Sequence, residues 1–151
     1  MSPAPVLLLI EDDRDHLDVT MRALRRAGIA AELRVVRDGQ AALDALGLED
    51  SGKSERQRLP RVVFLDLKMP RIDGWEVLRR IRACPRTARL PVVVVSESDR
   101  PEDVRLCYAL GANSYLLKRF DARSPGAYLA EAARYWIELN QVPSDMEAHT
   151  W

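Results

Sequence analysis

The chain has 151 residues, of which 47% are hydrophobic and 30% are charged, and this composition predicts a single soluble domain. Its 23 basic and 23 acidic residues balance, so no global field attracts nucleic acid or an anionic membrane. The early apolar run Val6–Ile10 follows no basic segment and is far too short to span a bilayer. We therefore expect a cytoplasmic protein without a signal peptide, without a nucleic-acid partner and without a membrane partner.

Five short apolar runs have the length and composition of strands. In chain order they are Val6–Ile10, Glu32–Val36, Val62–Leu65, Val92–Ser96 and Ser114–Lys118. The second run is more polar than the others, which places it nearer a sheet edge. Segments with apolar residues at helical spacing separate the runs. This alternation predicts an α/β fold, a doubly wound parallel sheet with helices on both faces.

Five segments between and after the predicted strands are expected to be helical. They are Arg14–Ala27, Gln40–Leu46, Trp75–Cys84, Pro101–Leu110 and a last helix from about Pro125 to Leu139. His16 follows the N-cap Asp13, and we expect it to be solvated, with a titrating or ligating role as the alternative. Five arginines decorate the third helix and its exit, and a solvated face is expected in preference to a basic binding patch. These are Arg79, Arg80, Arg82, Arg86 and Arg89.

The last helix carries two apolar stripes, which is more than one buried face needs. The second stripe either covers the edge of the core or forms a partner surface. The candidate interface residues of this helix and the segment after it are Tyr128, Tyr135, Trp136, Leu139, Val142 and Pro143. We expect a domain over residues 1–139, then a tail or arm over residues 140–151, and no output domain.

Residues Gly47–Ser54 read G-L-E-D-S-G-K-S and match the P-loop pattern letter for letter. A P-loop follows a strand and opens a helix, whereas this segment follows a predicted helix and precedes a polar stretch. The connection to the next strand is also shorter than the dozen or so residues that a parallel crossover needs. Glu49 and Asp50, inside the motif, would repel the phosphates of a nucleotide. A polar loop is therefore expected, with a nucleotide site as a remote alternative.

The strand ends carry the chemistry. In a doubly wound sheet ligands bind at the carboxyl ends of the strands, and four strands here end on Glu11 with Asp12, on Asp66, on Ser96 and on Lys118. Three carboxylates repel one another unless a cation joins them, and oxygen ligands suit Mg²⁺. An ammonium and a hydroxyl can orient the oxygens of a phosphoryl group on Asp66.

These motifs resemble those of response-regulator receiver domains of two-component signalling. The resemblance rests on E-D-D after the first strand, L-D-L-K-M-P-R-I-D-G, V-V-V-V-S and G-A-N-S-Y-L-L-K, and it covers roughly Val6 to Leu139. It implies a flavodoxin-like fold with strand order 2-1-3-4-5. The tail Y-W-I-E-L-N-Q-V-P is similar to that of single-domain regulators that partner bacterial phytochromes. It implies a bacteriophytochrome as the candidate kinase and a homodimer through the last helix and C-terminal arm.

The resemblance also implies roles for individual residues. Asp66 would accept phosphorus from the phosphohistidine of a sensor histidine kinase. Mg²⁺ would be held by Asp12, Asp66 and the backbone carbonyl of Lys68, with Glu11 acting directly or through water. The protein would be a phosphoacceptor with Mg²⁺-dependent self-phosphorylation and self-dephosphorylation, and no enzyme for an external substrate.

Three further positions bear on switching. Tyr115 occupies the aromatic switch position, and its ring is expected to turn inward as Ser96 moves toward the phosphoryl group. Receiver domains have a proline after the lysine, joined by a cis bond, where this chain has Arg119, so that bond is either trans or strained. Glu97 stands where a small residue is usual. An alternative reading is therefore a receiver-like interaction or dimerisation module with impaired phosphorylation.

Overall fold

The computed structural model describes residues 3–48, 58–119 and 123–143. Its strands are β1 (Val6–Ile10), β2 (Glu32–Val36), β3 (Val62–Leu65), β4 (Val92–Ser96) and β5 (Ser114–Leu117). Its helices are α1 (Arg14–Arg26), α2 (Gly39–Ala45), α3 (Gly74–Ala83), α4 (Pro101–Ala109) and α5 (Ala127–Arg134), with a π-helical turn η1 (Tyr135–Leu139). The strands form one parallel sheet in the order β2-β1-β3-β4-β5, which confirms the predicted fold class and strand order.

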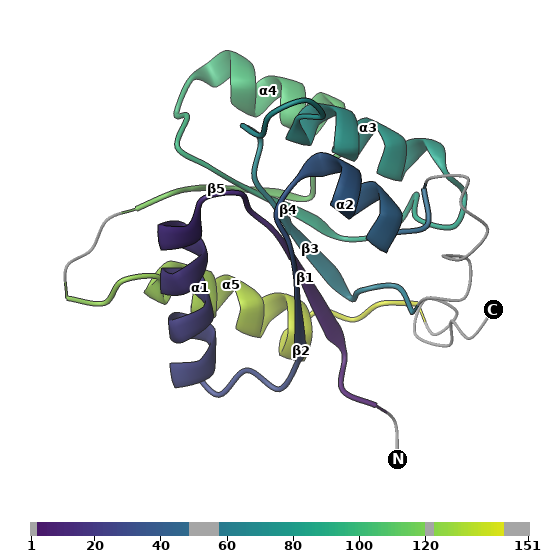
Figure 1. Cartoon of the computed structure of the whole chain (residues 1–151). Coiled ribbons are helices and arrows are strands. Elements are labelled where there is room, and N and C mark those ends of the chain that lie inside the picture. The colour runs from purple at the N-terminus through teal and green to yellow at the C-terminus, as the bar shows by residue number, and fades with distance from the viewer. Residues whose placement is uncertain (1–2, 49–57, 120–122, 144–151) are drawn as a thin grey trace.

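Helices cover both faces of the sheet. Figure 1 shows α2, α3 and α4 on one face and α1 and α5 on the other. In β3, Val63 and Leu65 face the first group of helices, whereas Val62 and Phe64 face the second. Covering both faces is the reason that the central strands are apolar without alternation. Because all strands are parallel, the residues that follow β1, β3, β4 and β5 meet at one edge of the sheet.

Aspartate side chains begin three helices, and two of these caps flank the strand ends. Asp13 accepts hydrogen bonds from the backbone N–H groups of Asp15 and His16, which confirms it as the N-cap of α1. Asp73 accepts from the N–H of Glu76 at the start of α3. These caps set the points at which α1 and α3 begin, close to the acids after β1 and β3.

The last helix occupies the predicted region, from about Pro125 to Leu139, but its final turn is π-helical. It begins at Ala127, and its end, Tyr135–Leu139, is π-helical, with the Asn140 N–H donating to the Tyr135 carbonyl at 2.7 Å. The later start follows from Gly126, whose φ of +75° favours glycine and whose added Cβ would lie 2.9 Å from Ala23 Cβ on α1. Close packing of α5 on α1 therefore decides where the helix begins.

The expectation of a solvated arginine face is wrong for Arg82 and Arg86. Arg82 donates to the carbonyls of Gly111 and Leu90 at 2.9 and 2.7 Å and to Oδ1 of Asn113 at 2.8 Å. Arg86 donates to the Leu46 carbonyl, directly after α2. The spacing of arginines along the chain cannot reveal these acceptors, because they lie in loops that only the fold brings to the guanidinium groups.

The P-loop-like segment lies mostly outside the described residues, which resume at residue 58. Gly47 and Leu48 are described, and α2 precedes them, as the rejection of a nucleotide site assumed. Within the described part of the chain, no helix is both long and apolar enough to cross a bilayer.

Candidate functional site

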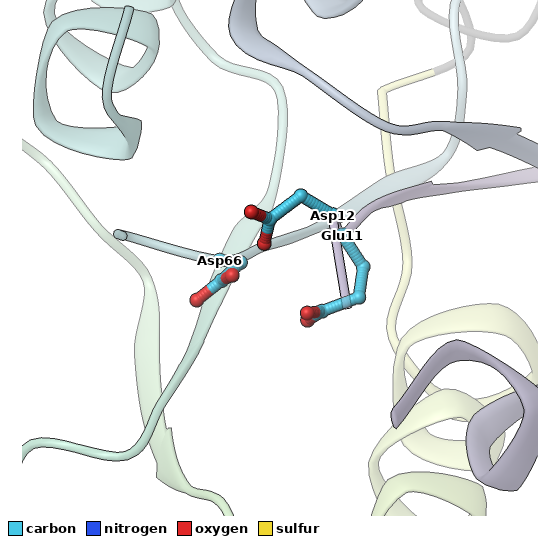
Figure 2. Close-up of side chains that lie close together, drawn as sticks. All are labelled: Glu11, Asp12 and Asp66. Carbon is cyan, nitrogen blue, oxygen red and sulfur yellow. The ribbon is translucent and has the colours of Figure 1, made fainter. Parts of the chain in front are cut away.

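Three carboxylates meet where β1 and β3 end. Glu11 and Asp12 follow β1 directly and Asp66 follows β3, and oxygens of the three side chains lie within 4.8 Å of one another. Figure 2 shows them converging from the two strand ends. The parallel register pairs Ile10 with Leu65, so the residues after these two lie side by side. Glu11 and Asp66 are buried, and Asp12 is half-buried.

Lys118 supplies the positive charge of this pocket. Its Nζ lies 3.1 Å from Oε2 of Glu11 and 3.5 Å from Oδ1 of Asp66. The Lys118 backbone N–H donates to the Ser96 carbonyl at 2.8 Å, so the pairing of β4 with β5 extends to the lysine. Burial alone would lower the pKa of Lys118, but the charges of Asp66 and Glu11 outweigh it and raise that pKa. The ammonium therefore stays charged.

The two buried carboxyl groups have opposite pKa shifts. Burial and then the charge of Glu11 raise the pKa of Asp66 to about 7, against the attraction of Lys118. Burial would also raise the pKa of Glu11, but hydrogen bonding to His16 and the charge of Lys118 lower it. The single positive charge of Lys118 therefore does not balance the negative charges that the three carboxyl groups would carry if all were ionised.

This set of donors fits a hard divalent cation. All three side chains offer carboxylate oxygens, and one ammonium faces them. Mg²⁺ prefers oxygen ligands and commonly uses one or two carboxylates while keeping several waters. A cation beside Asp66 would stabilise its ionised form against the effects of burial and of the neighbouring acids.

Ser96 and Tyr115 meet the loop that follows β4. Ser96 is buried, and its Oγ accepts from the N–H of Ser98 at 3.1 Å, which leaves the Ser96 hydroxyl proton free to be donated elsewhere. The Tyr115 hydroxyl donates to the Ser98 carbonyl at 2.7 Å, and its ring packs against the core under α2, α3 and α4. Sequence reasoning missed Ser98, whose backbone joins these two residues.

His16 contradicts the expectation of a solvated side chain. Its Nδ1 lies 3.2 Å from Oε2 of Glu11, its Nε2 lies 3.4 Å from the hydroxyl of Tyr128, and its side chain is 18% exposed. The start of α1 after the acids and the packing of α5 on α1 enclose it. The distance between His16 and Tyr128 in the sequence hid this contact.

Gly74 lets α3 begin against the loop that carries Asp66. A Cβ at this position would lie 2.2 Å from the Asp66 carbonyl oxygen, and the Gly74 N–H donates to the Leu67 carbonyl at 2.8 Å. Only glycine allows this close approach without a shift of backbone. Lys68 lies in the same loop with an exposed side chain, and the role of its carbonyl as a ligand stays a prediction.

The departures from the family pattern lie at the rim. The described residues contain no cis peptide bond, so the bond between Lys118 and Arg119 is trans. The side chains of Arg119 and Glu97 are exposed, and the charge of Glu97 helps to raise the pKa of Lys118 after the larger effects of Asp66 and Glu11.

The predicted interface residues range from half-buried to exposed. Tyr135 and Leu139 are 48% and 66% exposed, Trp136 is half-buried with its ring edge to face with that of Tyr135, and Tyr128 contacts His16. Val142 is half-buried and Pro143 is exposed. The rest of the predicted arm, residues 144–151, lies outside the described residues.

Comparison with known families matches residues 7–125 to the response regulator receiver domain. The chain belongs to this family. Among curated relatives, the receiver domain is 38% identical to the probable methanogenesis regulatory protein FilR2 of Methanothrix harundinacea (strain 6Ac), over 91% of this chain and 87% of that protein. It is 33% identical to the response regulator Rcp1 of Synechocystis sp. (strain ATCC 27184 / PCC 6803 / Kazusa), over 95% of this chain and 96% of that protein.

Solved structures agree with the sequence relatives. The Mn²⁺-bound form of Rcp1 superposes on the receiver domain with a TM-score of 0.82 and 33% identity, covering 92% of this chain and 99% of Rcp1. The phosphorylated cyanobacterial phytochrome response regulator RcpA superposes with a TM-score of 0.83 and 29% identity, covering 93% of this chain and 99% of RcpA. The likeness therefore extends over nearly the full length of these single-domain regulators.

Proposed function

We propose that this protein is a single-domain response regulator that accepts a phosphoryl group on Asp66 from a sensor histidine kinase. The observation that carries the proposal is the pocket in which Lys118 lies 3.5 Å from Asp66 among three converging acids. The similarity to Rcp1 and to phosphorylated RcpA supports it. The protein is a phosphoacceptor, and its self-phosphorylation and self-dephosphorylation depend on Mg²⁺.

The residues of the pocket divide the chemistry among them. An Asp66 oxygen attacks phosphorus while the bond from phosphorus to the donor imidazole nitrogen breaks, and the imidazole leaves. Lys118 then pairs with a phosphoryl oxygen, and the Ser96 hydroxyl donates to another. Bound Mg²⁺ supplies positive charge to the phosphoryl oxygens. Asp12, Asp66 and the Lys68 carbonyl would hold it, with Glu11 directly or through a water.

Two further parts of the proposal concern switching and partners. Tyr115 reports the phosphorylated state by moving with the loop after Ser96, to which its hydroxyl is joined. The kinase is a bacteriophytochrome-type sensor, by analogy with the bacteriophytochrome response regulator RtBRR, and the protein forms a homodimer through the exposed Tyr135 and Leu139 of η1 and the arm after residue 139. A cytoplasmic location and the absence of a nucleic-acid partner stay predictions.

An alternative function follows from Glu97 and Arg119. The Glu97 charge adds an acid to the surroundings of Lys118, and Arg119 replaces the usual proline. If these residues prevent phosphorylation, the protein is an interaction or dimerisation module with the receiver fold.

Phosphorylation separates the two functions. The protein is incubated with acetyl phosphate and Mg²⁺, and intact mass spectrometry is used to look for one alkali-labile phosphoryl group. We expect the adduct in the parent and in the control Asp18→Asn, an exposed acid of α1, and its loss in Asp66→Asn and in EDTA. Absence of the adduct in the parent, with both acetyl phosphate and a phosphorylated kinase, would favour the interaction module.

A further inference from the structure

A chain of polar contacts leads out of the acid pocket to the last helix. Lys118 contacts Glu11, Glu11 contacts His16 at 3.2 Å, and His16 contacts the Tyr128 hydroxyl at 3.4 Å. The members come from the ends of β5 and β1, from the first turn of α1 and from the first turn of α5. The phosphoryl chemistry proposed above uses neither His16 nor Tyr128.

The chemistry of the groups assigns the direction of each contact. The Glu11 carboxylate can only accept, and Nδ1 of His16 faces its Oε2 at 3.2 Å as an ion-pair contact. With the His16 proton on Nδ1, Nε2 accepts from the Tyr128 hydroxyl at 3.4 Å. Burial raises the pKa of Tyr128, opposed by a hydrogen bond from the Arg119 backbone, so the hydroxyl keeps the proton that it donates. A proline at residue 119 would have no N–H for this bond.

Glu11 is already fully engaged. Its two oxygens lie 3.2 and 3.1 Å from the Lys118 ammonium, one of them accepts from the Asp13 N–H at 3.1 Å, and the other faces His16. A cation held by Asp12 and Asp66 that also engages Glu11, directly or through a water, draws on the same oxygens. Binding of the cation and the contact with His16 therefore compete for Glu11.

We propose that His16 is a positioning residue that holds Glu11 in the arrangement described above, with its oxygens toward Lys118 and His16, and that, through Tyr128, it couples occupation of the acid pocket to α5. This inference rests on the proposed Mg²⁺ site. When Glu11 turns to the cation, His16 loses its acceptor, and the Tyr128 contact that ties the start of α5 to α1 weakens. Because coupling between sites is reciprocal, loss of the contacts must also change the affinity for the cation.

The test measures Mg²⁺ dissociation constants of the full chain by calorimetry. Removing a contact that competes with the cation for Glu11 favours binding of the cation, so His16→Leu should bind Mg²⁺ about three- to tenfold more tightly, the range expected for one charge-assisted polar contact. Tyr128→Phe, which removes only the hydroxyl, should shift affinity in the same direction by less. Tyr108→Phe on α4, a tyrosine that is 51% exposed, should leave it unchanged.

A second readout follows α5 itself. Amide hydrogen exchange of residues 127–134 should increase on Mg²⁺ addition in the parent and in Tyr108→Phe, and it should not respond to Mg²⁺ in Tyr128→Phe. This readout remains if His16→Leu fails to fold.

The possible results separate this inference from the proposed function. If the parent binds Mg²⁺ and becomes phosphorylated on Asp66 while His16→Leu and Tyr128→Phe keep the parent's Mg²⁺ affinity, the inference is overturned and the proposed function stands. Lower thermal stability of His16→Leu without a change in Mg²⁺ affinity would show a purely structural role for His16. Weaker Mg²⁺ binding by His16→Leu would show that His16 favours the cation, which also overturns the inference. A parent that binds no Mg²⁺ would overturn both.

Discussion

Asp66 is costly to ionise in the folded protein before any cation binds. Its carboxyl group is buried beside Glu11, and its pKa of about 7 lies above the ordinary value of 3.8. An acid whose pKa is higher in the folded state than in the unfolded state stabilises the folded protein fully at pH values below its unfolded-state pKa. That stabilisation is lost as the pH rises through its folded-state pKa. The contribution of Asp66 is therefore complete below about pH 3.8 and disappears near pH 7.

Asparagine at this position should reveal that cost. In EDTA at pH 8 we expect Asp66→Asn to raise the free energy of unfolding by about 2 kcal/mol, because the amide carries no charge to bury. The gain should shrink to nothing near pH 4, where the parent carboxyl is protonated. Urea unfolding at the two pH values measures it, with Asp18→Asn as the exposed control. An equal gain at both values would contradict the raised pKa.

At the scale of elements, one arginine joins α3 to the segments that precede β4 and β5. Arg82, in the last turn of α3, donates to Leu90 before β4 and to Gly111 and Asn113 before β5. Gly111 has a φ of +100°, and a Cβ there would lie 2.9 Å from Nε of Arg82. The guanidinium satisfies carbonyls of the two loops that position β4 and β5, at the opposite ends of these strands from Ser96 and Lys118.

Removal of this guanidinium should destabilise the protein. Arg82→Met keeps an unbranched apolar side chain but removes the donor to the carbonyls of Leu90 and Gly111, so we expect unfolding to require about 2–4 kcal/mol less free energy, measured by urea denaturation. Arg79→Met on the same helix removes only a pair with Glu76 at the surface and should cost under about 0.5 kcal/mol. Equal losses for both variants would show that Arg82 has no special part.

For the molecule as a whole, the exposed apolar residues of η1 bear on the proposed homodimer. Tyr135 and Leu139 are the two large apolar side chains of η1 that stay exposed among the described residues, while Ile137 is buried in the core. Contiguous exposed apolar groups are typical of an interface. They support the proposed homodimer.

Self-association therefore tests the whole-molecule proposal. Leu139→Glu places a charge at the centre of the proposed contact and should weaken the dimer at least about tenfold in sedimentation velocity experiments. Removal of residues 140–151 should weaken it as well. Leu106→Glu on α4, which is 44% exposed in the parent, is the matched control and should leave the dimer intact. A dimer unaffected by either change to the C-terminal region would refute this mode of assembly.

Sequence reasoning predicted the five strands and the meeting of Asp66 with Glu11, Asp12 and Lys118. These features depend on local apolar runs and on one rule of parallel sheets, that successive carboxyl ends share an edge. It failed for His16 and Arg82, and it left the isomer of the Lys118–Arg119 bond open. Their surroundings come from residues far along the chain, such as Tyr128 and Gly111, which only tertiary packing brings within hydrogen-bonding distance. The strand ends were thus determined by the sequence alone, and the contacts that surround and couple the acid pocket were decided by packing between distant elements.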